Sequence, residues 1–124
     1  MSEEKNSGYK KELGDKGEGI AASFLMKNGF EIIARNYRFG KIGEIDIIVR
    51  KGNLIVFAEV KSRNSGAFGG AYYSITEKKK LTLKKVARQF LHTHPAFFSK
   101  DITYRFDMIA IDNGKAEWIE DMFR

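Results

Sequence analysis

The sequence predicts an α/β fold, a three-layer sandwich in which helices flank a central mixed β-sheet. Two observations predict this class. Segments 9–27 and 75–93 carry apolar residues at helical spacing, and the shorter segments between and after them are rich in Ile, Val, Phe and Tyr. The order along the chain is helix, three strands, helix, strand, strand. This order is typical of a mixed sheet covered by helices.

The chain of 124 residues, with 43% apolar residues, is long enough for one domain around one core. Residues 1–8 are expected to form a flexible terminus. The absence of cysteine excludes disulfides and cysteine-based zinc sites and fits a reducing compartment. No apolar run approaches the roughly 18 residues of a membrane span, and the polar first residues lack a signal-peptide core. A soluble cytoplasmic protein without membrane attachment is therefore expected.

The first helix is predicted over residues 9–27, where the Asn28-Gly29 pair supplies a stop signal. Gly14, Gly17 and Gly19 lie inside it, and each costs up to about 1 kcal/mol relative to Ala. Close approach of the helix backbone to the sheet would offset this cost. Glu18 lies at the border of the apolar stripe, where its carboxylate could reach the end of the sheet. An ordinary solvent-facing Glu is the alternative.

The strands begin with segment 30–39, which turns at Gly40 into a β-hairpin. The hairpin consists of two apolar runs, 45–49 and 54–60, around a turn in which Gly52 or Asn53 can adopt positive φ. Because consecutive strands joined by short turns pair antiparallel, these three segments should form an antiparallel meander. After the second helix, segment 104–111 is predicted as a strand, and 116–119 as a short last one.

A glycine-rich loop precedes the second helix and contains Phe68, Tyr72 and Tyr73. These aromatic rings could stack on an unpaired base or cover the core, and we expect at least one tyrosine in the core. The helix itself is predicted over 75–93, with Thr76 as a cap. Two histidines near its end are two residues apart and do not share a helix face, so a histidine metal site is not expected.

The hairpin also carries charged residues that packing alone does not explain. Glu59 and Lys61 share one face of their strand, about 7 Å apart, and folding the hairpin back brings Asp46 close to Glu59. A Glu59–Lys61 ion pair on an exposed face, contributing about 0 to 1 kcal/mol, is the structural alternative. Two adjacent carboxylates repel, however, and a divalent cation with oxygen ligands or a raised pKa relieves the repulsion. This arrangement indicates a Mg²⁺ or Mn²⁺ site.

The net charge of +6 is unevenly distributed. Between Lys61 and Arg105 the chain has ten Lys or Arg residues and only two acids. A basic region beside a metal-suited pocket fits a phosphodiester substrate, although solvated lysines on a helix face are the alternative. Arg35 and Arg38 on the first strand could add phosphate contacts, or could protect the sheet edge from aggregation.

The motifs resemble those of the YraN-like family of small bacterial proteins over almost the whole chain, from about residue 14 to 118. The matching motifs are Gly17-Glu18, Arg35-Asn36-Tyr37, Gly43-Glu44-Ile45-Asp46, Phe57-Ala58-Glu59-Val60-Lys61-Ser62-Arg63, Lys79 and Arg105-Phe106-Asp107. Within them Glu18, Asp46, Glu59 and Lys61 resemble the PD-(D/E)XK signature of restriction-endonuclease-like nucleases, in the arrangement of archaeal Holliday junction resolvases.

This resemblance implies a restriction-endonuclease-like fold and a metal-dependent phosphodiesterase site. By resemblance, Asp46 and Glu59 would be the main ligands of Mg²⁺ or Mn²⁺, together with the backbone carbonyl of Val60. Glu18 would be an outer or additional ligand. Lys61 would orient the attacking water or stabilise charge in the transition state.

The expected nucleic-acid contacts are basic residues around this site. By resemblance, Lys79 would contact the backbone phosphate, although Thr82 stands where the family usually carries an Arg. The other basic residues expected to bind nucleic acid are Arg63, Lys78, Arg35 and Arg38. For Asp107, an exposed strand position or an ion pair with a basic neighbour is expected in preference to a site role.

Two functions from different classes follow from these expectations. The first is a Mg²⁺-dependent endonuclease that hydrolyses DNA, with branched or single-stranded DNA among its substrates. The second is a non-catalytic nucleic-acid-binding protein or DNA-repair adaptor that keeps the nuclease fold. DNA is favoured over RNA, although phosphate contacts do not distinguish the two. Cutting a junction would require two active sites and hence a homodimer.

Overall fold

The computed structural model describes residues 16–63 and 75–124. Its elements are the first helix (residues 16–27), β1 (Glu31–Phe39), β2 (Gly43–Lys51), β3 (Leu54–Arg63), α2 (Glu77–Thr93), the 3₁₀ turn η2 (Pro95–Phe97), β4 (Thr103–Asp112) and β5 (Lys115–Phe123). The predicted helices and strands are confirmed within these ranges. The predicted terminus 1–8, helix residues 9–15 with Gly14, and the loop aromatics Phe68, Tyr72 and Tyr73 lie outside the described residues. Neither described helix combines the length and apolar content needed to cross a membrane.

The five strands form one mixed sheet in the order β1-β2-β3-β4-β5. All neighbouring strands pair antiparallel except β3 and β4, which pair in parallel from Leu54 with Thr103 to Arg63 with Asp112. Parallel neighbours require a crossover connection, and α2 lies in the segment that joins them. The predicted antiparallel meander of β1, β2 and β3 is confirmed.

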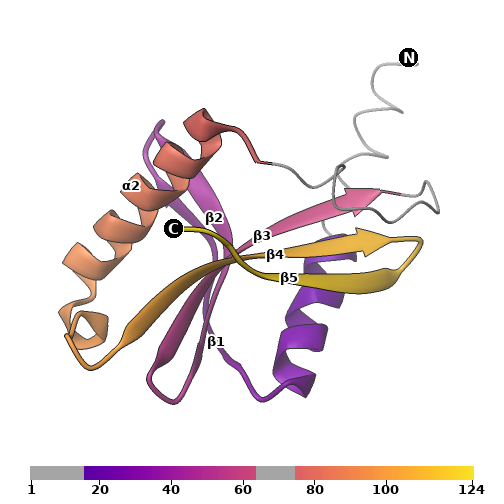
Figure 1. The fold of residues 1–124 in the computed structure, drawn as a ribbon, viewed down its shortest axis with the longest axis horizontal. Helices are drawn as coiled ribbons and strands as arrows, with labels where there is room; N and C mark the ends of the chain where they lie inside the picture. Colours follow the sequence, from indigo (N-terminus) through magenta and orange to yellow (C-terminus); the bar gives the residue numbers. More distant parts are fainter. Residues whose placement is uncertain (1–15, 64–74) are drawn as a thin grey trace.

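The two helices lie on opposite faces of this sheet, the first helix at the lower right and α2 at the upper left of Figure 1. Strand alternation separates the core into two halves. Val56 and Ala58 of β3 pack with the first helix, whereas Ile55 and Phe57 pack with Val86 and other apolar residues of α2. The predicted three-layer α/β sandwich is thereby confirmed.

Each helix touches the sheet closely through a glycine. A Cβ atom added at Gly17 would lie 1.7 Å from the hydroxyl oxygen of Ser62, and one added at Gly43 would lie 2.4 Å from Cγ2 of Thr82. Gly17 therefore meets the expectation of close backbone approach. For Gly19 that expectation is wrong, because an added Cβ would meet nothing within 4 Å.

The last strand is longer than predicted, and the buried carboxylate of Asp107 binds it where its backbone pairing with β4 shifts register. Oδ1 of Asp107 accepts hydrogen bonds from Arg105 Nε at 2.8 Å and from the backbone N–H of Asp121 at 2.8 Å. Oδ2 accepts from Arg105 at 2.7 Å and from the indole N–H of Trp118 at 2.9 Å. Of the two roles expected for Asp107, the structure shows the ion pair, which joins the buried Asp107 carboxylate to the half-buried Arg105.

Candidate metal centre

The candidate site lies where β2 and β3 separate. Their backbone pairing ends with Ile47 opposite Ala58, so Asp46 and Val60 lie beyond it. Instead of a backbone carbonyl, Oδ2 of Asp46 accepts the N–H of Val60 at 2.8 Å. Folding the hairpin back therefore places the Asp46 carboxylate at the site end of β3, next to Glu59, as the sequence predicts.

Glu59 is buried under α2, with 7% of its surface exposed. Its Oε2 lies 3.5 Å from Nζ of Lys79, which makes an ion pair, but no donor in the described part of the chain forms a hydrogen bond to this oxygen. The alternative Glu59–Lys61 pair is not found, and Lys61 is exposed. Lys79 is not predicted from the sequence as the partner of Glu59, although the Thr76 cap places Lys79 in the first turn of α2.

Burial sets the protonation of the two carboxyl groups. The pKa of Glu59 is raised to about 7, mainly by burial and then by the nearby Asp46, against the lowering effect of Lys79 and Lys61. The pKa of Asp46 is also raised, mainly by burial and then by Glu44, against the lowering effect of the Val60 hydrogen bond. The fold thus holds two neighbouring carboxyl groups where burial and mutual repulsion disfavour their charged forms.

This donor set fits a hard divalent cation. The two carboxylates supply charged oxygens, and one oxygen of Glu59 is buried without a hydrogen-bond donor among the described residues. The N–H and C=O of one strand residue point toward the same neighbouring strand, so the Val60 carbonyl faces β2 like its N–H. Mg²⁺ and Mn²⁺ prefer such oxygen ligands, with water completing the shell.

Glu18 is the predicted site residue that the structure does not join to this pair. It is half-buried in the first helix, beside Gly17, which packs on Ser62 near the same end of β3. Within residues 16–63 and 75–124, no group of three His, Asp or Glu side chains is positioned to hold a metal ion. The geometry therefore supports a two-carboxylate centre.

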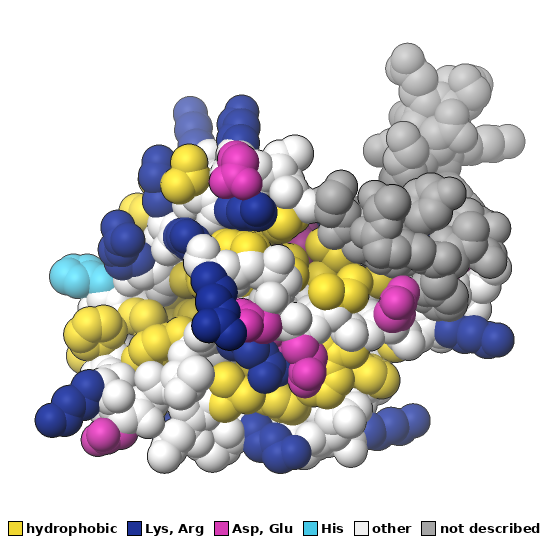
Figure 2. All heavy atoms as spheres, viewed as in Figure 1, with side chains coloured by type: hydrophobic (Ala, Val, Ile, Leu, Met, Phe, Trp, Pro, Cys, Tyr) yellow, Lys and Arg dark blue, Asp and Glu magenta, His cyan; other side chains and the backbone are white. Residues whose placement is uncertain are grey.

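The predicted nucleic-acid contacts fall into two groups. Arg35 and Lys78 are exposed, whereas Arg38 pairs with Glu44 at 3.1 Å and Arg63 is half-buried and interacts within the chain. Figure 2 shows Lys and Arg side chains gathered over α2, at the upper left of the view. Lys79 belongs to this basic helix and forms an ion pair with Glu59, so the basic surface of α2 lies next to the carboxylate pair.

Fold and site define a class of protein, an α/β sandwich with two carboxylates and two lysines at the open end of its central hairpin. Residues 17–111 match the model of "Uncharacterised protein family UPF0102". The chain belongs to this family, which is the YraN-like family that the motifs resemble.

Relatives in this family align over most of the chain. A UPF0102 protein of Caldicellulosiruptor saccharolyticus is 47% identical over 102 residues, which cover 82% of this chain and 83% of that protein. A UPF0102 protein of Methylobacillus flagellatus is 41% identical over 116 residues, covering 91% and 97%. One of Chloroherpeton thalassium is 39% identical over 124 aligned positions, covering 90% and 93%. Family membership thus extends through both the carboxylate pair and the basic helix.

Proposed function

We propose that this protein is a divalent-metal-dependent endonuclease that hydrolyses phosphodiester bonds in nucleic acid, with DNA as the expected substrate. The observation that carries the proposal is the pair of half-buried Asp46 and buried Glu59, which lies beside Lys79 and the basic surface of α2. The pair suits a hard cation, and the basic surface suits the phosphate backbone that such a cation would act on.

The roles of the residues follow from their positions. Asp46, Glu59 and the Val60 carbonyl would hold Mg²⁺ or Mn²⁺, which when bound acidifies water and neutralises charge on a phosphate. Lys61, exposed on the same strand face as Glu59, would donate a hydrogen bond to the reacting phosphate or to the attacking water. Hydrolysis forms a bond from the water oxygen to phosphorus and breaks one P–O ester bond. The leaving oxygen then takes up a proton.

A non-catalytic nucleic-acid-binding protein is the second candidate, and one contact favours it. Lys79, whose side chain is partly exposed, already compensates the charge of buried Glu59 in the absence of a metal, so the site can persist as an ion pair. Such a protein would keep the basic surface for binding and Asp46 for its hydrogen bond to the N–H of Val60. The two candidates differ in whether millimolar Mg²⁺ produces cleavage.

The test is cleavage of labelled single-stranded, duplex, flapped and four-way-junction DNA with Mg²⁺ or Mn²⁺, against EDTA. Glu59→Gln and Asp46→Asn, each checked for folding, should abolish metal-dependent cutting. Glu117→Gln, an exposed position on β5, is the matched control, and this variant should cut the DNA like the unmodified protein. Binding of all four DNAs without cutting by any preparation would exclude the endonuclease and favour the binding protein.

A further inference from the structure

The outer face of α2 and the end of β1 form an open pocket with a volume of about 290 Å³. This volume lies at the small end of ligand sites, so it suits one compact group. The helix contributes residues at positions 85, 88, 89 and 92, which recur on one helical face, and β1 contributes a single aromatic ring. The lining residues are Phe39, Lys85, Arg88, Gln89 and His92.

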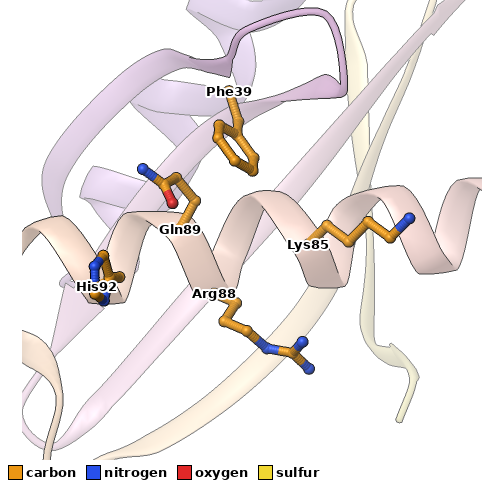
Figure 3. Close-up of a pocket in the computed structure, with 5 residues that line it drawn as sticks. All are labelled: Phe39, Lys85, Arg88, Gln89 and His92. Carbon is orange, nitrogen blue, oxygen red and sulfur yellow. The ribbon is translucent and has the colours of Figure 1, made fainter.

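Figure 3 shows how these side chains lie. The ring of Phe39 extends from β1 toward α2, and Gln89 rises from α2 on the same side as that ring. Lys85 extends along the helix to the right of this region, and Arg88 extends from the opposite side of the helix in this view. The pocket therefore has a flat apolar surface with a nearby amide, and its rim is positively charged.

The cations at the rim differ from their neighbours because they are not neutralised. Lys79 pairs with Glu59 and Lys80 with Glu77, and Lys84 donates to a backbone carbonyl. Lys85 and Arg88, in contrast, form no ion pair or hydrogen bond with any residue in the described ranges. These two exposed cations lie near the Gln89 amide and the Phe39 ring. Together the four side chains are complementary to a group that is both flat and anionic.

We infer that this pocket binds one unpaired nucleotide of a nucleic-acid strand. Its base would stack on Phe39, with the Gln89 amide and the His92 ring available to the base edge. Its phosphates would lie against Lys85 and Arg88.

This inference rests on the proposed function and specifies its substrate. Lys79, at the carboxylate pair, and Arg88 are nine residues apart, or about 13 Å along the helix. That distance corresponds to about four nucleotides at the rise of a B-form strand. A base inside a duplex exposes its edge rather than its face. Stacking on Phe39 in this pocket therefore requires a single-stranded or extruded nucleotide. The substrate class is therefore nucleic acid with an unpaired segment a few nucleotides from the reacting phosphate.

The test measures binding in EDTA, where cleavage is prevented, by fluorescence anisotropy with a 12-nucleotide oligothymidine and a 12-base-pair duplex. Phe39→Leu removes the ring but keeps an apolar side chain, and should weaken single-strand binding about tenfold while leaving duplex binding unchanged. Phe39→Trp should retain the single-strand preference. Lys85→Gln with Arg88→Gln should weaken both ligands. Lys27→Gln, at the exposed end of the first helix on the opposite sheet face, is the charge control and should bind like the unmodified protein.

Equal affinity of Phe39→Leu and the unmodified protein for oligothymidine would overturn the inference and reduce the pocket to a phosphate-binding surface. Loss of affinity in Phe39→Trp as large as in Phe39→Leu would also overturn it, since stacking would not then be the cause. Phe39-dependent binding without cleavage of any DNA would refute the endonuclease and support the pocket. Cleavage together with Phe39-independent binding would support the endonuclease and overturn the pocket. No binding of oligothymidine by the unmodified protein would overturn the pocket, and the cleavage assay alone would then decide on the endonuclease.

Discussion

At the scale of single residues, Glu59 is a group whose charge opposes folding. Its pKa is raised to about 7 mainly by burial, so the folded protein retains the proton over a pH range in which the unfolded chain has lost it. The stability contribution of Glu59 is therefore largest below its ordinary pKa of 4.5 and declines as pH rises to about 7. One pKa unit corresponds to about 1.4 kcal/mol, so the whole decline between 4.5 and about 7 is at most about 3.5 kcal/mol.

Glu59→Gln should remove this dependence, because the amide does not titrate. Urea unfolding in EDTA at pH 5 and pH 8 gives the free energy of unfolding of the variant and of the unmodified protein. The difference between the two proteins isolates Glu59, because the other acidic residues are the same in both. We expect the variant to be more stable at pH 8 by about 1 to 3 kcal/mol and to differ less at pH 5. A variant that is less stable than the unmodified protein at pH 8 would show that the Lys79 ion pair outweighs the cost of burial.

Asp107 is the opposite case, a buried carboxylate whose hydrogen bonds are satisfied. Asp107→Asn removes the charge and turns one acceptor atom into a donor, which faces Arg105 and either the Asp121 N–H or the Trp118 N–H. The free energy of unfolding should fall by about 3 kcal/mol, the cost of breaking a buried ion pair. Chemical denaturation measures the change. Asp101→Asn, at an exposed turn, serves as the control and should shift the same quantity by less than about 0.5 kcal/mol.

At the scale of elements, two glycines of the first helix lie two positions apart and should respond to Ala in opposite directions. Gly17→Ala places a methyl group on the hydroxyl of Ser62 and should destabilise the fold by about 1 to 3 kcal/mol. Gly19→Ala meets open space and should stabilise it by about 0.5 to 1 kcal/mol, because Ala restricts the unfolded chain. The melting temperatures of the two variants, compared with that of the unmodified protein, give the sign of each change in stability. Changes of the same sign would mean that the first helix does not lie against Ser62.

The elements themselves could be predicted because their signals are local. Helical spacing of apolar residues and the Lys51-Gly52-Asn53 turn act over a few residues, and Gly52 does adopt a φ of 58°. The Asp46–Glu59 proximity was also predictable, because a hairpin turn determines its own register.

What could not be predicted depends on segments that are distant in sequence. The Lys79–Glu59 contact depends on where the crossover places α2 over the sheet, and no local pattern encodes that position. The extension of β5 depends on Asp107 accepting the N–H of Asp121, 14 residues away. The pocket at Phe39 requires β1 and α2 together, so neither segment alone indicated it.

At the scale of the whole molecule, the net charge of +6 should make nucleic-acid binding strongly dependent on salt. For a single strand, the logarithm of the association constant should fall linearly with the logarithm of salt concentration, with a slope of about −0.7 per phosphate contacted. Lys85→Gln with Arg88→Gln should reduce the magnitude of that slope by about 1.4. Anisotropy titrations from about 50 to 200 mM KCl measure it. An unchanged slope would place the phosphate contacts on another surface.

Metal binding should couple the candidate site to the stability of the entire fold. A cation that binds only the folded state stabilises it by about 1.4 kcal/mol at ten times its dissociation constant, which raises the melting temperature by several degrees. Protons compete for Glu59 below its pKa of about 7, so 10 mM MgCl₂ should raise the melting temperature more at pH 8 than at pH 5.5. EDTA should reverse the effect, and Asp46→Asn should abolish it, while Glu117→Gln should preserve it. An equal Mg²⁺-induced shift in Asp46→Asn would show that the ion binds elsewhere, and that the carboxylate pair is then a structural feature of the hairpin.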